Sequence, residues 1–378
     1  MSSRPLAVSR RLTVVQLLPA LDAGGVERST LEVAEALVAA GHRAIVVSAP
    51  GRLCAALTAC GGEHRPLAIG VKSPFGLRHL FALRRLFQGA DIVHARSRLP
   101  AWLGYLAWRT MRGRRPAFVT TVHGLNSVGR YSAIMTRGER VIVVSNTVRD
   151  YLLAHYPGLD ATRLRVIPRG IDATHFARGY RASGDWRARF EAEYPQAAGA
   201  PWLCLPGRGT RLKGHHDALR LLAGLRAAGT DARLILLGAA QSGREHYLDE
   251  LLQEAARLGV RQRIVITPPR ADVREVMSAS ALVLQLSGKP EAFGRTVIEA
   301  LHLGVPVLGY AHGGVGELLV ECFPEGAVAL ADEPALLARA LALLEQRPQP
   351  RVFSGYRLQD MQTATLAVYA ELLAERGA

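Results

Sequence analysis

The sequence predicts an α/β protein of two doubly wound domains, each a parallel sheet covered by helices, with a ligand-binding cleft between them. Three observations predict this class. The chain has 378 residues, more than one hydrophobic core usually organises. It is 49% apolar, which excludes a disordered chain. Short apolar runs alternate with helical stretches twice, so we expect domains over residues 1–180 and 181–354 and a C-terminal helix over 355–378 that packs back toward the first domain.

The first half of the chain begins with the apolar strand Leu12–Leu18, a glycine turn, and a helix over Val26–Ala40 that Gly41 ends. Four further apolar runs follow, with helical stretches between them: Ala44–Ser48, Asp91–His94, Phe118–Val122 and Val141–Val144. These runs are apolar almost throughout instead of alternating with polar residues. They are therefore typical of parallel strands buried on both faces.

The second half restarts the same pattern after residues 172–200, which are polar, carry no strand pattern and are expected to form a linker. Its expected strands are Trp202–Leu205, Arg233–Leu237, Arg263–Ile266, Leu282–Leu286 and Pro306–Leu308. In open parallel sheets ligands bind beyond the carboxyl ends of the strands. The loops that follow strands are therefore where functional residues are expected.

Cysteine usage and hydropathy limit the class of protein. The four cysteines, Cys54, Cys60, Cys204 and Cys322, show no metal-ligand or dithiol spacing, so we expect buried free thiols in a reducing compartment. No run of about 18 apolar residues occurs, and the apolar run at the N-terminus is too short for a signal peptide. We expect a cytoplasmic protein.

The charge is divided unevenly along the chain. Residues 1–180 hold 25 Arg and Lys against 10 Asp and Glu, whereas residues 181–378 hold 22 of each sign. A basic half indicates a surface that meets anions, such as lipid headgroups, phosphorylated glycans or nucleic acid. The chain contains no nucleic-acid-binding module, so we expect no nucleic-acid partner.

The loop Leu205–His215 follows an expected strand and opens an expected helix. It combines three glycines with Arg208, Arg211 and Lys213. Glycines let the backbone approach an oxyanion, the helix N-terminus adds partial positive charge, and the side chains supply charge-assisted hydrogen bonds. The composition therefore predicts a phosphate site, although it lacks the Gly-Lys-Ser/Thr ending of a Walker loop.

A second motif, Glu291–Glu299, follows the strand that ends near Leu286, and Gly294 stands where a helix should begin. Along a helix its two carboxylates would be up to about 12 Å apart. That separation suits a nucleotide sugar. The diphosphate would rest on the helix N-terminus, with sugar hydroxyls near Glu291 and ribose hydroxyls near Glu299.

These motifs together resemble the retaining glycosyltransferases of family 4, which have the GT-B fold. The resemblance rests on E-A-F-G-R-T-V-I-E over Glu291–Glu299, His312–Gly314, Asp22–Arg28, Val166–Asp172 and the G-R-x-x-x-x-K-G loop over Gly207–Gly214. It covers almost the whole chain. It implies two Rossmann-like domains and transfer of a sugar from a nucleotide-diphosphate sugar with retention of configuration.

The resemblance also implies roles for individual residues. Arg208 and Lys213 would hold the donor diphosphate, and Glu291 would lie near the transferred sugar. The remaining donor contacts would come from the ribose-binding Glu299, the backbone around the helix start and the segment bordering the nucleobase: Glu299, Phe293, Gly294, Arg295, Thr267 and Pro268. One position departs from the family, which usually carries Asn where Arg169 stands.

No Asp-x-Asp stands at a strand end, so we expect no metal and no cofactor. The co-substrate would be a UDP-, GDP- or ADP-linked sugar. The leaving diphosphate would be neutralised by Arg208, Lys213 and a helix dipole. The family is generally viewed as using front-face displacement, which requires no protein nucleophile.

The acceptor is expected on the N-terminal side. Backbone amides of Gly24 and Gly25 would point into the cleft and meet donor phosphate or acceptor. A dinucleotide site is excluded because G-x-G-x-x-G and its acidic partner are missing. His94 and His123 each follow a strand, and the resemblance places a catalytic His-Gly such as His123 near the transferred sugar. The other acceptor-side candidates are His94, Arg96 and Arg98.

We therefore expect transfer to a glycan or glycolipid acceptor, in lipopolysaccharide or other envelope polysaccharide synthesis. Another GT-B enzyme, a phosphorylase or a nucleotide-sugar epimerase, is the alternative. Phe75–Phe87 and Ala101–Arg115 mix aromatic residues and arginine at helical spacing. Such faces can lie on an anionic bilayer, so we expect peripheral association with the inner face of the cytoplasmic membrane.

Overall fold

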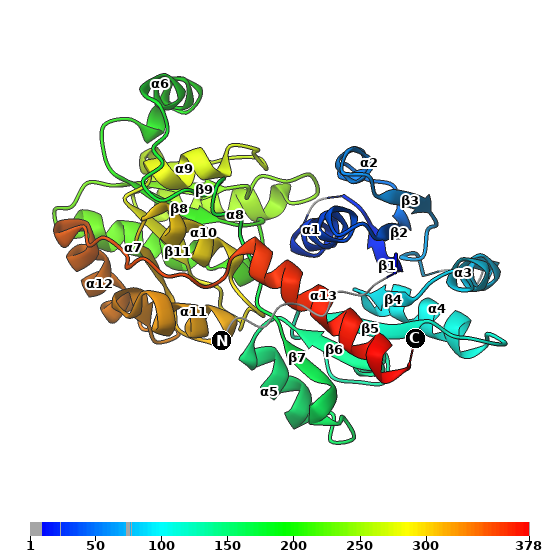
Figure 1. The fold of residues 1–378 in the computed structure, drawn as a ribbon. Coiled ribbons are helices and arrows are strands. Elements are labelled where there is room, and N and C mark those ends of the chain that lie inside the picture. The colour runs from blue at the N-terminus through cyan, green and yellow to red at the C-terminus, as the bar shows by residue number, and fades with distance from the viewer. Residues whose placement is uncertain (1–9, 23, 73–75, 77, 378) are drawn as a thin grey trace. The chain divides into compact units, whose positions relative to one another are not determined.

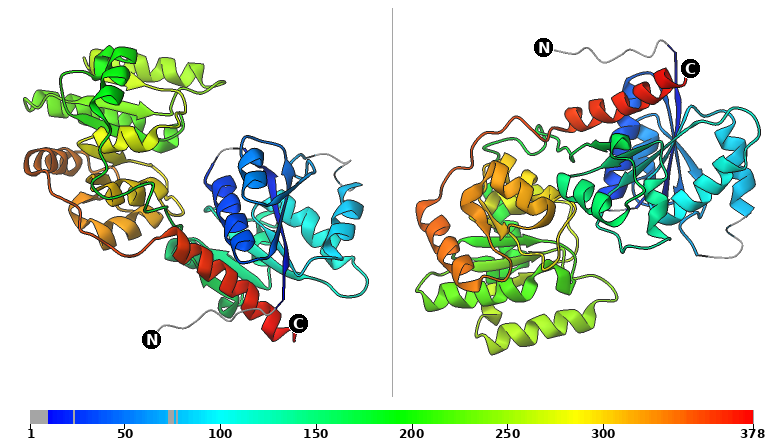
Figure 2. Two further views of the ribbon diagram at one scale, coloured as in Figure 1. Left: turned by 45° about the horizontal axis from the view of Figure 1, so that its top comes forward. Right: turned by 90° about the horizontal axis from the view of Figure 1, so that it is seen from below.

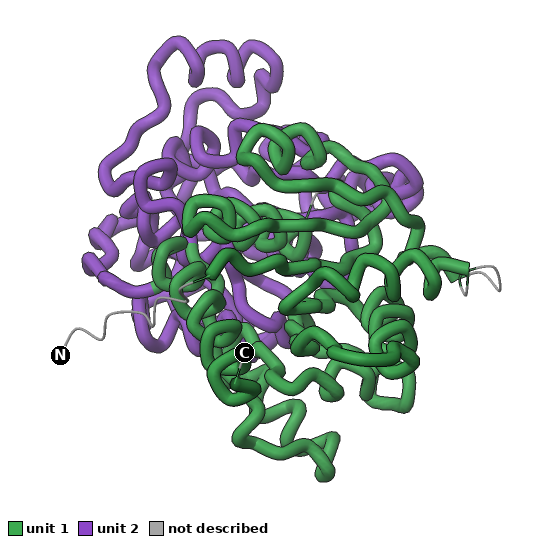
Figure 3. The backbone as a smooth tube through the Cα atoms, turned by 45° about the vertical axis from the view of Figure 1, so that its right-hand side comes forward, with its two compact units in different colours: residues 1–170, 356–378 green, residues 171–355 purple. Residues whose placement is uncertain are grey.

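The computed structural model describes residues 10–22, 24–72, 76 and 78–377. The chain splits into two compact units, which are coloured separately in Figure 3. Unit 1 comprises residues 1–170 and 356–378, and unit 2 comprises residues 171–355. The first boundary lies ten residues before the expected one. Each unit contains one parallel sheet covered by helices, which confirms the predicted fold class (Figure 1).

The sheet of unit 1 has seven parallel strands in the order β3-β2-β1-β4-β5-β6-β7. Their bounds are β1 Thr13–Ala20, β2 Arg43–Ala49, β3 Glu63–Pro66, β4 Ile92–Ala95, β5 Ala117–Val122, β6 Arg140–Val143 and β7 Leu164–Val166. The central strands are buried on both faces, as their apolar runs predicted. β3 and β7 were not predicted. They are the two edge strands, and β3 contains no apolar residue except Pro66.

Six α-helices belong to the described part of unit 1: α1 Gly25–Ala39, α2 Cys54–Ala59, α3 His79–Phe87, α4 Arg98–Arg109, α5 Asn146–His155 and α13 Leu358–Glu375. α1 and α13 lie side by side on one face of the sheet, and α3 packs beside α4 on the other (Figure 2). α1 ends where Gly41, at φ 80°, donates its N–H to Val38 O at 2.9 Å. This confirms the predicted glycine stop.

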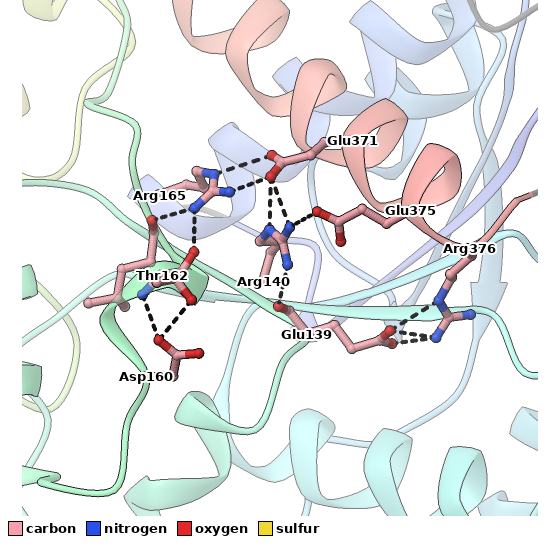
Figure 4. A network of polar contacts seen from close by, with 9 residues as sticks. Glu139, Arg140, Asp160, Thr162, Arg165, Glu371, Glu375 and Arg376 are labelled. Atoms are coloured by element: carbon pink, nitrogen blue, oxygen red, sulfur yellow. Dashed lines mark hydrogen bonds and ion pairs between the residues drawn. The ribbon is translucent and has the colours of Figure 1, made fainter.

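The last helix, α13, completes the core of unit 1. Its residue Tyr369 is 1% exposed and packs among the apolar residues of α1 and the sheet. Ion pairs hold the same helix to β6 and β7, and Figure 4 shows them. Glu371 accepts hydrogen bonds from Arg140 at 2.9 Å and from Arg165, and Arg376 donates to Glu139 at 2.6 Å.

The sheet of unit 2 has six parallel strands in the order β10-β9-β8-β11-β12-β13. Their bounds are β8 Trp202–Pro206, β9 Arg233–Leu237, β10 Ile264–Ile266, β11 Leu282–Gln285, β12 Val307–Tyr310 and β13 Ala327–Val328. The α-helices are α6 Gly184–Glu193, α7 His215–Ala227, α8 Glu245–Arg257, α9 Val273–Ala279, α10 Arg295–Leu303, α11 Gly313–Cys322 and α12 Glu333–Gln346.

The expected linker over residues 172–200 contains α6 and belongs to unit 2. Ser183 caps this helix by accepting from Trp186 N at 3.2 Å. Phe190 packs against Trp202 of β8 with ring centroids 5.0 Å apart. The cap and the aromatic packing stabilise a helix whose sequence has little apolar periodicity.

Both sheets reverse their strand order beside the first strand of the unit. In unit 1 this switch point lies between β1 and β4, and in unit 2 it lies between β8 and β11. Loops beyond the carboxyl ends of such strands diverge and leave a crevice for a ligand. The fold therefore predicts one ligand-binding crevice in each unit.

The state of the cysteines and the hydropathy of the helices were also predicted from the sequence. Cys204 and Cys322 are buried free thiols, as expected, whereas Cys54 and Cys60 are half-buried. Within the described residues, no helix combines the length and the apolar character needed to cross a membrane. Part of the expected amphipathic segment, residues 75 and 77, lies outside the described residues.

Candidate functional site

The glycine-rich loop of unit 2 runs from the end of β8 to α7. Gly214 has φ 73°, and a Cβ there would lie closer than 3.0 Å to Leu286 O. A Cβ on Gly209 would meet Ala239 O equally closely. Gly288 N donates to Leu212 O at 2.9 Å, which ties this loop to the one after β11. These glycines are required because the backbones of neighbouring loops approach each other closely.

An ion pair joins the two loops at the same place. Lys213 Nζ lies 2.6 Å from Glu291 Oε1, and both side chains are about one quarter exposed. Gln285 Nε2 donates to the same oxygen at 2.7 Å, and the Ser287 hydroxyl also donates to it. The sequence predicted Lys213 and Glu291 as site residues but gave no sign of Gln285 and Ser287. Their contribution depends on how the loop folds after β11.

The two arginines of the glycine-rich loop differ. Arg208 is exposed, and no hydrogen bond or ion pair of its side chain occurs among the described residues. Arg211 pairs with Glu250 of α8 instead. Of the two, Arg208 is therefore the one available to a ligand.

α10 begins beside Glu291. Its N-cap is Gly294, at φ 111°, where no side chain caps the helix and no acidic residue stands in the first turn. No carboxylate of the first turn offsets the positive end of the helix dipole, which suits an anion. Glu299, 6% exposed, accepts from Arg295 Nε at 3.1 Å.

Two hydrogen bonds from the His312–Gly314 segment hold the loop that carries Glu291. His312 Nε2 hydrogen-bonds Ser287 O at 2.7 Å, and because a carbonyl only accepts, the histidine donates. Gly314 N donates to Glu291 O at 2.8 Å. The His312–Gly314 motif therefore holds the backbone on which Glu291 stands.

The segment expected to border the nucleobase follows β10. Thr267 is buried, and its Oγ1 accepts from Gly238 N at 3.0 Å and donates to Pro268 O at 2.9 Å. Its side chain is therefore occupied in joining the loops after β9 and β10. Pro268 is exposed at the surface of that junction.

Unit 1 has a pocket of about 260 Å³ at its own switch point. Its lining comes from the ends of β1, β4 and β5 and from the first turns of α1 and α4. The lining residues with polar side chains are Glu27, Arg96, Ser97, Arg98, Thr121, His123 and Asn126. Gly24 and Gly25 directly precede the lining residue Val26, and Gly24 is the N-cap of α1.

Arg96, which is 3% exposed, is one of the lining residues of this pocket. Its Nε donates to Gln16 Oε1 at 2.8 Å and its Nη1 to Ser29 Oγ at 3.3 Å, and both partners are neutral. Burial lowers the pKa of Arg96, and interactions with Tyr369 and Glu32 oppose that shift. Its Nη2 has no hydrogen-bond partner in the described part of the chain.

His123 lines the same pocket and contacts Arg169, the residue that departs from the family pattern. Arg169 Nη2 is hydrogen-bonded to His123 Nδ1. A guanidinium only donates, so Nδ1 must accept and carry no proton. Burial, with Arg169 next in importance, holds the pKa of His123 well below its usual value, and the ring is neutral. Its single proton therefore resides on Nε2, which is buried without a partner among the described residues.

His94 and Arg98, the other acceptor-side candidates, lie in different surroundings. His94 is fully buried, with Nδ1 2.7 Å from Tyr369 OH and Nε2 2.6 Å from Thr121 Oγ1. Both of its ring nitrogens are occupied, and it is not among the pocket's lining residues. Arg98 is half-buried at the pocket, 5.4 Å above the ring of Tyr131.

Comparison with known proteins gives two family models that match consecutive parts of the chain. Glycosyltransferase Family 4 matches residues 23–175, and Glycosyl transferases group 1 matches residues 187–357. The D-inositol 3-phosphate glycosyltransferase of Nocardia farcinica is 31% identical over 246 residues, which are 60% of this chain and 52% of the relative. The chain thus spans about half the length of the curated relatives it matches.

Solved structures match over nearly the whole chain. A glycosyltransferase from Rickettsia africae has a TM-score of 0.82 at 27% identity, covering 96% of this chain and 99% of that one. Anabaena HepE, solved with UDP and glucose, has a TM-score of 0.75 at 20% identity, covering 97% and 99%, and shows the same fold. With its two parallel sheets and both family models matched in order, the chain belongs to the family 4 glycosyltransferases of the GT-B fold.

Proposed function

We propose that this protein transfers a sugar from a nucleotide-diphosphate sugar to a glycan or glycolipid acceptor, with retention of configuration. In this proposal unit 2 binds the donor and unit 1 binds the acceptor. The observation that carries it is the Lys213–Glu291 ion pair beside the uncapped start of α10, at the switch point of unit 2. The presence of UDP and glucose in the Anabaena HepE structure supports a nucleotide-sugar donor.

When a diphosphate binds, Lys213 can exchange its ion pair with Glu291 for one with the phosphate. Glu291 already accepts hydrogen bonds from Gln285 and Ser287, so it keeps two partners if Lys213 turns toward phosphate. Lys213 and the exposed Arg208 then donate to the diphosphate. Glu291 retains lone pairs with which to accept from sugar hydroxyls.

The other donor contacts follow from position. Backbone N–H groups from Phe293 to Arg295 stand at the start of α10, where an anion is favoured. Glu299 lies in the same helix and is assigned to the ribose hydroxyls. The nucleobase is assigned to the surface at Pro268. The base is that of a UDP, GDP or ADP sugar.

The proposed chemistry needs neither a protein nucleophile nor a metal ion. The acceptor hydroxyl forms a bond to the anomeric carbon on the side from which the diphosphate leaves, and the bond between that carbon and the phosphate oxygen breaks. The departing diphosphate oxygen takes the hydroxyl proton. Arg208, Lys213 and the helix dipole stabilise the negative charge that accumulates on the diphosphate.

His123 takes part as a hydrogen-bond donor in this proposal. His123 lines the pocket of unit 1, and its protonated Nε2, which has no partner among the described residues, can donate to an oxygen of a bound ligand but cannot accept a proton. This narrows the role that the sequence suggested for it. We assign His123 to binding and orienting a ligand.

The acceptor is proposed to belong to envelope polysaccharide or lipopolysaccharide synthesis and to be met at an anionic membrane surface. The basic excess of residues 1–180 supports this. On α3, Phe81 is 75% exposed with the Arg84 guanidinium 5.6 Å from its ring centroid. Flotation with vesicles of anionic and of zwitterionic lipid tests this part. Binding to anionic vesicles that Phe81→Ser weakens is expected, and no binding at physiological salt would contradict it.

Product analysis tests the transfer itself. Incubation with a nucleotide sugar and a glycan acceptor should yield the free nucleoside diphosphate and an acceptor-linked sugar with the donor's anomeric configuration, as read by NMR. A phosphorylase would instead release a sugar phosphate from a glycan and inorganic phosphate. An epimerase would alter the sugar with no acceptor present. Either product without acceptor glycosylation would overturn the proposal.

A further inference from the structure

We infer that the unit 1 pocket binds an oxyanion, a phosphate or carboxylate group, carried by the acceptor. The assignment to the acceptor rests on the proposed function, whereas the preference for an oxyanion rests on the pocket itself. Three features of the pocket favour an oxyanion: its unpartnered buried groups are hydrogen-bond donors, Arg96 is charged, and the N-terminus of α4 borders it.

The unpartnered buried groups at the pocket are both donors. They are Arg96 Nη2 and His123 Nε2, each without a hydrogen-bond partner in the described part of the chain. Leaving a buried donor unpaired costs about 1–3 kcal/mol, so a ligand that supplies acceptors would recover this free energy. A phosphate or carboxylate oxygen is an acceptor without a competing donor.

Charge separates an oxyanion from a neutral hydroxyl. Arg96 is 3% exposed, yet Gln16 and Ser29, to which it donates, are neutral, as is Tyr369, which also interacts with it. Glu32 also interacts with it electrostatically. A buried cation is stable when an anion is close, and a bound oxyanion would supply that countercharge.

The N-terminus of α4 also favours a bound oxyanion. This 12-residue helix has no side-chain cap and no acidic residue in its first turn, and its first residue is Arg98. A cation at the positive end of a helix is unfavourable unless an anion lies between them. An oxyanion there would interact favourably with both the helix start and the Arg98 guanidinium.

α1, whose start also borders the pocket, differs in this respect. Glu27 stands in its first turn, and its carboxylate lies so close over Gly24 that a Cβ there would meet Glu27 Oε2. Glu27 therefore offsets the dipole of its own helix. The oxyanion is accordingly assigned to the α4 side of the pocket, and Glu27 can accept from a hydroxyl of the same ligand.

Arg169 acts on this site as a positioning residue. By donating to Nδ1 it keeps the His123 proton on Nε2, which is the ring nitrogen without a partner among the described residues. A residue without a donor at position 169 would allow the other tautomer, which presents a lone pair to the oxyanion and repels it.

Titration of inorganic phosphate into the full chain tests the site, after saturation with whichever of UDP, GDP or ADP raises its melting temperature. The nucleotide occupies the donor's phosphate site, so further phosphate binding reports a second site. Calorimetry should detect that binding. Arg98→Gln should weaken it about tenfold or more, since a hydrogen bond to a charged group is lost. Arg109→Gln, at the other end of α4, is the matched control and should leave it unchanged.

Three results would overturn the inference. They are no phosphate binding to the nucleotide-saturated protein, equal weakening by the two arginine variants, or complete displacement of phosphate by nucleotide, which would show that the pocket holds the donor's own phosphates. Failure of the proposed function has a different signature, because then none of the three nucleotides binds at all.

Nuclear magnetic resonance of ¹⁵N-histidine-labelled protein tests the positioning role directly. The His123 signals are identified by their loss in His123→Gln. Nε2 should carry the proton, and this pattern should not change between pH 6 and 8. Arg169→Met should give a mixture of tautomers and weaker phosphate binding, whereas Arg169→Gln, whose amide can still donate, should restore both. A proton on Nδ1 in the unaltered protein would refute the role.

Discussion

The two switch points have the same topology but opposite electrostatic states. In unit 2 the cation and the carboxylate at the crevice, Lys213 and Glu291, are paired with each other. In unit 1 the buried arginine at the switch point, Arg96, has neutral hydrogen-bond partners and a nitrogen without a partner among the described residues. Lys213 and Glu291 of unit 2 are thus paired before a ligand binds, whereas Arg96 of unit 1 lacks a charged hydrogen-bond partner within the part of the chain that the structure describes.

This difference suggests how one fold serves two ligands. A paired site can release its cation to a leaving group whose charge grows during the reaction, which is where electrostatic stabilisation has the largest effect. A site with an unpaired cation is stabilised most by a ligand that carries its negative charge throughout the reaction. We therefore associate the unit 2 crevice with the donor diphosphate and the unit 1 pocket with the acceptor.

The largest expected effect is on turnover. Lys213→Ala should lower kcat about a hundredfold or more, because one preorganised donor to the leaving diphosphate is lost. Lys289→Ala is the control, since Lys289 is exposed in the loop after the same strand, β11. Initial-rate assays of both variants decide the matter. Turnover at the unaltered rate in Lys213→Ala would remove Lys213 from the donor site.

The next largest effect is on stability and contrasts glycines from the two crevices. Gly214→Ala places a Cβ closer than 3.0 Å to Leu286 O at φ 73°, so the unfolding free energy should fall by at least about 2 kcal/mol. Gly25→Ala meets nothing within 4 Å and should change stability by less than about 0.5 kcal/mol. Chemical denaturation measures both. Equal stability of the two variants would show that the unit 2 loops are not packed as described.

A smaller expected effect is on the pH dependence of stability, which should differ between the two units. Burial holds the pKa of His94 and His123 in unit 1 well below the usual value, and it lowers that of His215 in unit 2 to about 4. Below pH 6.5 the unfolded chain binds protons that these folded sites do not, so the unfolding free energy falls as pH falls. The slope is at most about 1.4 kcal/mol per pH unit for each histidine.

Amide hydrogen exchange between pH 7 and 5.5 measures this in each unit. Burial also lowers the pKa of His42, His64 and His79 in unit 1, so the strands of unit 1 should lose more protection than those of unit 2. Equal losses in the two sheets would contradict the neutral state assigned to His94 and His123.

The smallest expected effect is that of a chelator. Because Arg208, Lys213 and the α10 dipole are proposed to neutralise the diphosphate, dialysis against EDTA should leave the initial rate unchanged. Loss of activity that returns on adding a divalent cation would show that unit 2 uses a metal at this position.

The sequence predicted those parts of the fold that depend on local patterns. The buried central strands and the end of α1 at Gly41 follow from apolar runs and one glycine. β3 was missed because an edge strand of Glu-His-Arg-Pro lacks an apolar pattern, and α6 because a cap and aromatic packing stabilise it.

The sequence indicated individual site residues, but it did not indicate which of them contact each other. Lys213 and Glu291 are 78 positions apart, and Arg169 and His123 are 46 apart. His94 and Tyr369, 275 positions apart, meet only because α13 packs on unit 1. No spacing rule connects such residues. The sequence therefore indicated a histidine at each strand end, and only the structure shows that His123 faces a pocket while His94 is enclosed in the core.

The division of ligands between the units is tested most directly by nucleotide affinity in one variant of each site. UDP, GDP and ADP are titrated calorimetrically into the full chain, into Lys213→Ala and into Arg98→Gln. The account predicts that at least one nucleotide binds, that Lys213→Ala weakens its binding about tenfold or more, and that Arg98→Gln leaves the affinity unchanged. Equal weakening by both variants, or by Arg98→Gln alone, would contradict the assignment of the donor to unit 2.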